Sequence, residues 1–232
     1  MNQYYHTEIS EEFLLNEEES THLLRVMRAQ PGMKIRVSDG LGTLAICELM
    51  GKSGRKAQLR AIEMECLSEP LPKLTLVFAP VKSSERNEWL MEKATEIGVN
   101  DIYPVLCQRS ERKTLNMERS RKLLIAAMKQ SQSAWLPRLH PMQKLDRFLT
   151  EYKGTKKVIG HVTDEAQEFH SFLKKPTELD YTVVIGPEGD FTPEEFNLAV
   201  RQNYQAVTLG PNRLRTETAA IYAIVGLNLY LR

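Results

Sequence analysis

The spacing of hydrophobic positions changes character about a third of the way along the chain. Up to about residue 66, short stretches alternate polar and apolar positions, which is typical of strands that bury one face. The first part is therefore predicted to be a small β-barrel. Its expected elements are a strand opening at Tyr4-Tyr5, a short helix at 17–28, a strand at 33–38, a hairpin at Asp39-Gly40, a strand at 43–49, a turn at 52–55 and a strand at 56–65.

From residue 73 onward, strands alternate with helices instead, which indicates an α/β layer fold. The two patterns are separated by the segment SEPLP at 68–72, whose prolines favour extended backbone. We expect one domain at 1–69 and a second at 73–232. The expected strands of the second are 74–79, 102–106, 156–161, 181–185 and 206–209, and its expected helices are 84–97 with Trp89 on the inner side, 118–133, 145–152, one that begins at Thr192, and one from Thr216 to the C-terminus.

One strand-to-helix junction has the features of a ligand-binding loop. The apolar strand at 181–185 is followed by GPEGD at 186–190, where two glycines allow backbone to approach a ligand closely. The next helix has a strong start signal, because Thr192 can cap it, Pro193 suits its first position and Glu195 completes a capping box. The loop is therefore expected to be fixed at both ends.

A second junction repeats this plan about 20 residues later. The strand at 206–209 leads into GPNRLR at 210–215, and Thr216 is expected to cap the last helix. Ligands of open α/β sheets bind at the carboxyl ends of strands, where both loops and the segment Gly160-His161-Val162 are expected. Two ordinary strand-to-helix turns remain the alternative. Neither GxGxxG nor GxxxxGK[ST] occurs, which argues against a phosphate-rich cofactor.

Composition excludes several classes of site. The three cysteines stand far apart and the five histidines form no pair at helical spacing, so neither a disulfide framework nor a metal site is expected. No apolar run is long enough to span a bilayer and the N-terminus has no signal-peptide pattern, so we expect a cytoplasmic protein. The net charge is only +1, but residues 103–147 hold ten basic and three acidic side chains, which suits a polyanionic partner.

The two loop sequences resemble those of a known family. GPEGDF and LGPNRLRTETA resemble the GPEGG-F and LG-x-x-LR-x-ETA signatures of the RsmE family, SPOUT-class methyltransferases that act on N3 of a uridine in small-subunit rRNA. Upstream, HLLRVMR at 22–28 resembles the family's H-x-x-R-V-L-R segment, with Met27 in place of leucine. Asp190 departs from the family pattern, which has a second glycine there, and Lys129 stands where glutamate is commoner.

The resemblance implies an N-terminal PUA-like β-barrel and a C-terminal SPOUT α/β domain with a trefoil knot that holds S-adenosyl-L-methionine. Glu188 is expected to shape the loop as well as border the cofactor. The residues expected to bind the cofactor are Gly160, His161, Ile185, Gly186, Pro187, Glu188, Gly189, Leu209, Gly210, Leu214 and Thr218.

Two residues near the start of the last helix are expected to act in catalysis. Uridine N3 must lose a proton, and a cation beside O2 or O4 lowers the cost of the resulting anion, a role that we assign to Arg215. Glu217 can orient that arginine or accept the proton. The alternative for Glu217 is a favourable acidic residue at a helix N-terminus.

RNA contacts are expected from basic and polar side chains in both domains. They are Arg25, Arg28, Lys82, Arg86, Arg109, Arg112, Lys129 and Gln130.

The resemblance also implies 16S rRNA or an assembled small ribosomal subunit as the substrate, and a homodimer. Two other functions remain open: a SPOUT methyltransferase with a different RNA acceptor, such as a ribose 2′-OH or a tRNA base, and an RNA-binding ribosome assembly factor without catalysis. Asp190 keeps the second possibility open, although aspartate tolerates unusual backbone angles better than most residues.

Overall fold

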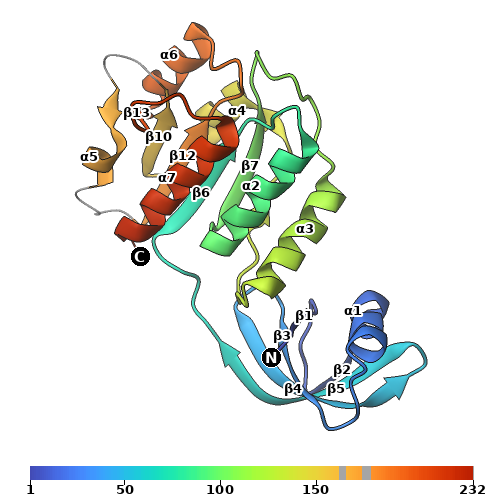
Figure 1. Cartoon of the computed structure of the whole chain (residues 1–232). Coiled ribbons are helices and arrows are strands. Elements are labelled where there is room, and N and C mark those ends of the chain that lie inside the picture. Colours follow the sequence, from blue (N-terminus) through green and yellow to red (C-terminus); the bar gives the residue numbers. More distant parts are fainter. Residues whose placement is uncertain (162–165, 174–178, 232) are drawn as a thin grey trace. The chain divides into compact units, whose positions relative to one another are not determined.

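The computed structural model describes residues 1–161, 166–173 and 179–231 (Figure 1). Backbone contacts divide the chain into two compact units. The first comprises Met1–Glu69 and Ile125–Leu136, and the second comprises Pro70–Leu124 and Pro137–Arg232. The segment Ile125–Leu136 therefore packs with the first unit, although the sequence pattern assigned it to the second domain.

The first unit is built on a five-stranded sheet with the order β1-β3-β4-β5-β2. β1 runs parallel to β3, and the other neighbours are antiparallel. The three strands expected from alternating positions are present, and Ile35, Val37 and Leu49 face the core as the alternation requires. The strands are β1 (Gln3–Tyr5), β2 (Glu12–Leu14), β3 (Lys34–Ser38), β4 (Thr43–Ser53) and β5 (Lys56–Cys66).

The helix predicted at 17–28 is present from Glu17 to Val26, but its second half is π-helical. The α-helix α1 (Glu17–Thr21) is capped by the Asn16 side chain and passes directly into a π-helical turn, η1 (His22–Val26). In that turn the backbone N–H of Met27 bonds to the His22 carbonyl, five residues back, so later side chains leave the α-helical face. Met27 is consequently 40% exposed.

The second unit contains an eight-stranded sheet whose pairings are all parallel. Its order is β11-β13-β10-β12-β6-β7-β8, and β9 pairs with the far end of β7. The five strands that the sequence predicted are all present. The strands are β6 (Lys73–Phe78), β7 (Asp101–Leu106), β8 (Arg138–Leu139), β9 (Gln143–Lys144), β10 (Lys156–Gly160), β11 (Gln167–Glu168), β12 (Asp180–Ile185) and β13 (Gln205–Thr208).

Helices cover both faces of this sheet (Figure 1). On one face α7 packs against β6, β12 and α2, and on the other α4 and α6 contact each other over a core that includes Val105, Phe148 and Val184. This two-sided burial explains the continuous apolar runs of the central strands. The helices are α2 (Ser84–Ile97), α3 (Met117–Gln130), α4 (Leu145–Glu151), α5 (Phe169–Leu173), α6 (Pro193–Arg201) and α7 (Thr216–Leu231).

Helix α2 begins and ends where the sequence indicated, and Leu90 and Ala94 face inward as expected, but Trp89 does not. Ser83 caps the N-terminus through the Arg86 backbone N–H, and Gly98 ends the helix in the left-handed conformation. The buried face includes Asn87, whose side chain bonds to both backbone groups of Val81. Trp89 was predicted to face inward and is 45% exposed.

A buried carboxylate joins β7 to β8 at the end of the sheet opposite the two loops. Asp101 receives two hydrogen bonds from Arg138, at 2.9 and 2.6 Å, and lies 2.7 Å from Nε2 of His140. The His140 ring stacks on Tyr103 with centroids 3.7 Å apart. Burial by itself raises the pKa of Asp101, but the hydrogen bonds and charges of Arg138 and His140 outweigh it and lower that pKa to about 2.

Replacement of Asp101 is expected to destabilise the second unit in a pH-dependent way. An ordinary Asp has a pKa of about 3.9 in unfolded chains, so the lowered value corresponds to about 2 kcal/mol that is present above about pH 4. This contribution is lost as pH falls towards 2. Urea unfolding should therefore show Asp101→Asn to be less stable than wild type at pH 7, with a difference that shrinks by pH 3.

Two arginine variants serve as controls for this prediction. Arg138→Met should reproduce the loss at pH 7, whereas Arg121→Met, at an exposed position of α3, should change the unfolding free energy little. An Asp101→Asn variant that is equally destabilised at pH 7 and pH 3 contradicts the assignment.

Candidate functional site

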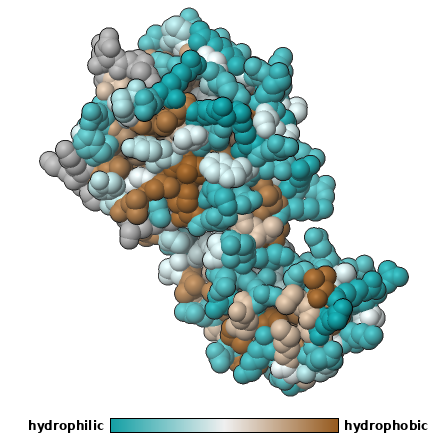
Figure 2. Space-filling model, in the orientation of Figure 1, coloured by the Kyte–Doolittle hydropathy of each residue, from teal (hydrophilic) through white to brown (hydrophobic). Residues whose placement is uncertain are grey.

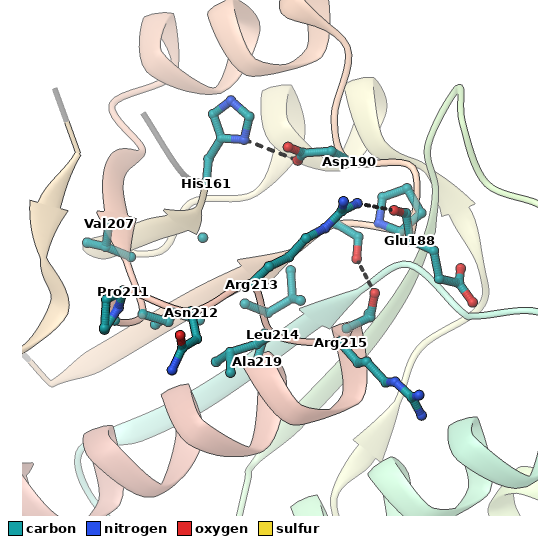
Figure 3. A pocket seen from close by; sticks show the side chains of 17 residues that line it. His161, Glu188, Asp190, Val207, Pro211, Asn212, Arg213, Leu214, Arg215 and Ala219 are labelled. Carbon is teal, nitrogen blue, oxygen red and sulfur yellow. Dashed lines mark hydrogen bonds and ion pairs between the residues drawn. The ribbon is translucent and has the colours of Figure 1, made fainter. Parts of the chain in front are cut away.

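The carboxyl ends of three neighbouring strands enclose a cavity of about 530 Å³ (Figure 3). The strands are β10, β12 and β13, and the two loops singled out from the sequence follow β12 and β13. The cavity therefore lies at the sheet edge where open α/β folds bind ligands. Its lining consists of Gly160, His161, Ile185, Gly186, Pro187, Glu188, Asp190, Val207, Leu209, Gly210, Pro211, Asn212, Arg213, Leu214, Arg215, Thr216 and Ala219.

The first loop is held almost entirely through its carbonyl groups. Each of the five carbonyl oxygens from residue 185 to residue 189 accepts a hydrogen bond from the protein, at 3.0 to 3.3 Å. Four of the five donors come from other parts of the second unit. In the order of the carbonyls, the donors are Ala79 N, Thr216 Oγ1, Asp190 N, Arg213 Nη2 and Arg109 Nη1.

The same loop leaves a backbone donor unpaired beside the cavity. The N–H of Glu188 has no hydrogen-bond partner within the part of the chain that the structure describes, and Glu188 lines the cavity. The parallel register of β10 and β12 directs the N–H of Gly186 to the Gly160 carbonyl instead. A backbone N–H that is removed from water costs free energy unless it is paired. The loop is therefore suited to bind polar acceptor atoms of a ligand without a formal charge.

Local sequence explains how this loop closes. Asp190 adopts the left-handed conformation with φ of 63°, and its N–H completes a turn with the Pro187 carbonyl. Beyond the turn, Thr192 and Glu195 form the predicted capping box. The second oxygen of Glu195 also accepts a hydrogen bond from Gln108 N at 2.8 Å, which ties the helix start to the β7–α3 loop.

Arg109 holds the outer side of the turn. Its Nη1 donates to the carbonyls of Gly189 and Phe191, at 3.1 and 3.2 Å. A Cβ at residue 189 would lie 3.1 Å from the Arg109 side chain, so any larger residue there would require Arg109 to shift by a few tenths of an ångström. Arg112 has a similar role on the neighbouring loop, because it donates to the carbonyls of Val81 and Lys82 and to the Ser84 hydroxyl.

The second loop is joined to the first at two points. Arg213 reaches across to the Glu188 carbonyl, and the Thr216 hydroxyl donates to the Gly186 carbonyl (Figure 3). Thr216 was predicted to cap α7; it is instead the first residue of that helix, and its hydroxyl links the helix to the first loop. Gly210 has φ of 111°, a conformation that side chains rarely adopt.

His161 and Asp190 form a pair on the rim of the cavity. Nδ1 of His161 lies 3.1 Å from Oδ1 of Asp190, and the imidazole packs against the Phe196 ring with centroids 4.5 Å apart. The third residue of the predicted segment at the end of β10, Val162, lies outside the described residues.

Nine of the eleven residues predicted to bind a cofactor line this cavity. Gly189 and Thr218 do not: Gly189 faces Arg109, and Thr218 is exposed on α7. The nine are Gly160, His161, Ile185, Gly186, Pro187, Glu188, Leu209, Gly210 and Leu214.

The sequence prediction missed several lining residues. Arg213 and Asn212 belong to the loop already singled out, so its polar side chains were the available signal. Asp190 was noted only as a departure from the family pattern. The remaining missed residues are Val207, Pro211, Thr216 and Ala219.

The two predicted catalytic residues lie in different surroundings. Arg215 lines the cavity and is exposed, and its guanidinium has no hydrogen-bond or ion-pair partner among residues 1–161, 166–173 and 179–231. Glu217 is buried and lies 3.6 Å from Nε of Arg86, so its neighbour is Arg86 and not Arg215. Its Oε2 is buried and has no hydrogen-bond partner in the described part of the chain.

The predicted RNA-binding residues are also in varied environments. Lys82 is 82% exposed and pairs with Glu111. Lys129 binds the buried carboxylate of Glu19 within the first unit, so its charge already has a partner. The others are Arg25, Arg28 and Gln130, which are exposed, and Arg86, Arg109 and Arg112, whose contacts are given above.

In the described part of the chain, the cavity has neither a metal centre nor a thiol nucleophile beside it. Among the described residues, no group of three or more His, Cys, Asp or Glu side chains is arranged to hold a metal ion. Cys107 is buried at the base of the β7–α3 loop, where burial and the nearby Glu195 carboxylate raise the pKa of its thiol. Within the described chain, no helix is long and apolar enough to cross a membrane.

Comparison with known proteins identifies the class of fold and site. A family model for an RNA methyltransferase domain matches residues 68–228, and one for an RNA methyltransferase PUA domain matches residues 15–62. The second unit is thus an RNA methyltransferase domain, and the first is PUA-like.

Individual relatives specify the family. The chain is 30% identical over 210 residues to ribosomal RNA small subunit methyltransferase E of Rickettsia conorii. The aligned region covers 85% of this chain and 83% of that protein. The chain is 28% identical over 233 residues to the protein of that name from Bacillus subtilis, with 93% and 89% covered. A crystal structure of the Neisseria gonorrhoeae protein bound to S-adenosyl methionine has a TM-score of 0.88 and 26% identity, covering 99% of this chain and 97% of that one.

The chain therefore belongs to the ribosomal RNA small subunit methyltransferase E family. The resemblance drawn from the two loop motifs is confirmed.

Replacement of Arg109 tests how the first loop is held. Arg109→Ala removes two hydrogen bonds to loop carbonyls, and a loss of about 1.4 kcal/mol would raise the frequency of loop opening about tenfold. Amide hydrogen exchange at Asp190 and Phe191 should accelerate accordingly. Arg112→Ala is the matched control, because it releases the loop at Val81 and should leave exchange at 190–191 unchanged. Equal effects of the two variants on residues 190–191 would refute a specific clamp.

Proposed function

We propose that this protein uses S-adenosyl-L-methionine to methylate N3 of a uridine in 16S rRNA of the small ribosomal subunit, at the family's site, uridine 1498. The observation that carries the proposal is the cavity at the strand ends, whose two loops hold the GPEGDF and LGPNRLRTETA motifs. Support for the cofactor comes from the Neisseria gonorrhoeae relative, which was solved with S-adenosyl methionine.

The residues present fit such a cofactor. A volume of about 530 Å³ is within the range typical of small-molecule and cofactor sites. The unpaired N–H of Glu188 suits an acceptor nitrogen of adenine. Leu209, Leu214 and Ile185 supply apolar surface for its ring. At Gly160 a Cβ would lie 3.0 Å from Ile185, so a larger residue there would crowd the cavity wall.

The residues proposed to hold the cofactor are those predicted from the sequence. Gly189 and Thr218 are among them, although neither lines the cavity. Gly189 allows the turn to pack on Arg109, and Thr218 lies on the first turn of α7. When bound, the cofactor supplies an electrophilic methyl group on a sulfonium. The protein's part is to bind, to orient and to stabilise the acceptor.

Arg215 is the proposed stabiliser of the uridine anion. Its guanidinium is exposed at the cavity and is not paired by any described residue, so it is free to donate to O2 or O4 of a uracil. Figure 3 shows it directed away from Glu188 and Arg213. A guanidinium already placed where negative charge develops lowers the barrier without reorganisation at the moment of reaction.

Glu217 is proposed to act beside it, as an orienting group or as the proton acceptor. Glu217 is within reach of Arg86, so it is better placed to orient Arg86 than to orient Arg215. A buried carboxylate oxygen without a partner is costly, which favours a functional role for Glu217 over a purely structural one.

RNA is proposed to contact basic residues of both units. Arg25 and Arg28 in the first unit, and Lys82 in the second, are exposed and well suited to phosphate contacts. Arg109, Arg112 and Lys129 already bind other groups of the protein. These three residues, with Arg86 and Gln130, are proposed to add weaker contacts with the RNA. With ribosomal RNA as its substrate, the protein is proposed to act in the cytoplasm.

The trefoil knot is proposed for residues between β10 and α7. β13 lies beyond β10 at one side of the sheet, and α7 then returns to pack on β6 and β12. The connecting residues 209–215 pass directly against the first loop, as the bond from Arg213 to Glu188 shows. This return path is consistent with a threaded chain.

A homodimer is proposed through α7. Its exposed side carries a row of apolar residues spaced three or four apart, and Figure 2 shows hydrophobic side chains gathered over this helix. An exposed apolar patch of this kind on a folded protein commonly marks an interface. The row consists of Tyr222, Val225 and Leu229, with Tyr230 beside it.

Two alternatives remain. Another RNA acceptor, a ribose 2′-OH or a tRNA base, would use the same cavity, because the motifs describe the cofactor loops more than the acceptor. A non-catalytic assembly factor is less favoured, because Asp190 occupies its left-handed position without disrupting the turn.

The proposal is tested by methyl transfer to small ribosomal subunits from cells that lack this protein. Labelled S-adenosyl-L-methionine should yield 3-methyluridine, and Arg215→Ala should lower the rate by about 100-fold or more while cofactor affinity stays within about twofold. Arg213→Ala is the contrasting variant, because it disturbs the cofactor loops and should weaken cofactor binding. Label on a ribose or on another base would show that the proposed acceptor is wrong. RNA binding without any methyl transfer would favour the assembly factor.

The dimer is tested by sedimentation velocity. The wild-type protein should sediment at twice the chain mass of 26.6 kDa, and Leu229→Glu should produce monomers because a charge would be buried in an apolar contact. Val200→Glu, at an exposed apolar position on α6, is the control and should remain dimeric. A monomeric wild-type protein would refute the proposed interface.

A further inference from the structure

In the pair formed by His161 and Asp190, one carboxylate oxygen is engaged and the other is open. Oδ1 of Asp190 accepts hydrogen bonds from Phe191 N at 2.7 Å and lies 3.1 Å from Nδ1 of His161. Oδ2 has no hydrogen-bond partner within the described ranges, and the side chain is 49% exposed at the cavity. The carboxylate therefore offers one fixed oxygen and one open oxygen.

Both partners of this pair are firmly positioned. The His161 side chain is only 17% exposed, its ring packs on Phe196 and Phe191, and its backbone N–H bonds to the Val207 carbonyl. Asp190 is held by its own turn, through the bond from its N–H to the Pro187 carbonyl. A hydrogen-bonding group that is already oriented loses little freedom when it binds a ligand, which favours affinity and selectivity.

The backbone conformation at residue 190 disfavours most side chains. With φ of 63° the position favours glycine, and only Asn and Asp among the other residues adopt this conformation with ease. The turn would close equally well with glycine, since the bond from residue 190 to Pro187 uses backbone atoms alone. A carboxylate at this position is therefore best explained by what the side chain itself contacts.

Asp190 is also the acidic group best placed to meet a ligand. The cavity has one other lining carboxylate among the described residues, Glu188, whose Oε1 accepts from Lys82 N at 3.3 Å. Figure 3 shows the Glu188 side chain turned away from the cavity. The imidazole beside Asp190 makes the pair better suited to neutral O–H donors than to a cation, because a cation would compete with His161 for the same carboxylate.

We propose that Asp190, oriented by His161, determines recognition of the ribose in the cofactor site, with Oδ2 accepting a hydrogen bond from a ribose hydroxyl. This inference rests on the proposed function, since it requires a nucleoside cofactor in this cavity. A carboxylate near a strand end is chemically suited to a ribose diol, because both hydroxyls donate and the carboxylate only accepts. His161 is a positioning residue in this arrangement.

The experiment compares ribose selectivity in binding, without turnover. Adenosine, 2′-deoxyadenosine and 3′-deoxyadenosine compete at equilibrium with labelled S-adenosylhomocysteine for the full-length protein. Wild type should bind adenosine about tenfold more tightly than at least one of the deoxynucleosides. Asp190→Gly should reduce this preference to within about twofold, and Asp190→Asn should retain part of it.

Matched variants separate this role from a structural one. Asp190→Gly removes the contacts of Oδ1 but relieves the left-handed backbone, and these effects oppose each other, so its thermal midpoint should change little. Asn203→Gly makes the equivalent change at another position with φ of 63°, in the turn before β13, and should leave ribose selectivity unchanged. His161→Phe keeps a ring on Phe196, removes the hydrogen bond to Asp190 and should lower the preference partially.

The outcomes distinguish failure of this inference from failure of the proposed function. If wild type binds no S-adenosylhomocysteine, both the proposed cofactor and the ribose assignment are wrong. If wild type binds it but Asp190→Gly keeps full ribose selectivity, only the assignment of Asp190 is overturned. A variant that loses S-adenosylhomocysteine affinity while adenosine binding and ribose selectivity stay intact would also overturn it, because Asp190 would then act on the amino-acid tail.

Discussion

The structure of the site depends on the pairing of backbone carbonyls in one short loop. Residue 185 ends β12 and residues 186–189 have no regular secondary structure, so these carbonyl groups must find partners elsewhere or remain in water. Their donors are Ala79 N just after β6, Arg109 of the β7–α3 loop, Arg213 of the β13–α7 segment, Thr216 at the start of α7, and Asp190 N of the loop itself. With all five carbonyls paired to the protein, the path of the loop along the cavity is fixed.

This arrangement explains why both loops could be found from sequence while several of their important partners could not. The loops have local signals: Thr192 and Glu195 are three residues apart, and glycines recur at turns. Arg109 lies 80 residues from the carbonyl that it binds, and His161 lies 29 residues from Asp190. Such pairs depend on the order of strands in the sheet, and that order is not encoded in any periodicity.

The fold shows a similar limit. Long apolar or alternating stretches predicted the central strands, whereas two-residue strands such as β8 and β11 are too short to show a pattern. The π-helical second half of the helix predicted at 17–28 could not be foreseen, because a π-helical turn has no distinct composition. Trp89 was placed on the wrong side of α2 because an amide, Asn87, occupies the buried face by pairing with backbone.

The contacts of Thr216 and Arg213 with the first loop have a consequence for local stability. The two residues bond to carbonyls that lie 30 and 25 residues earlier in the chain. Arg213 precedes α7 and Thr216 begins it, so unfolding at the start of this helix would release both carbonyls together. The first loop and the start of α7 are therefore expected to open as one cooperative unit.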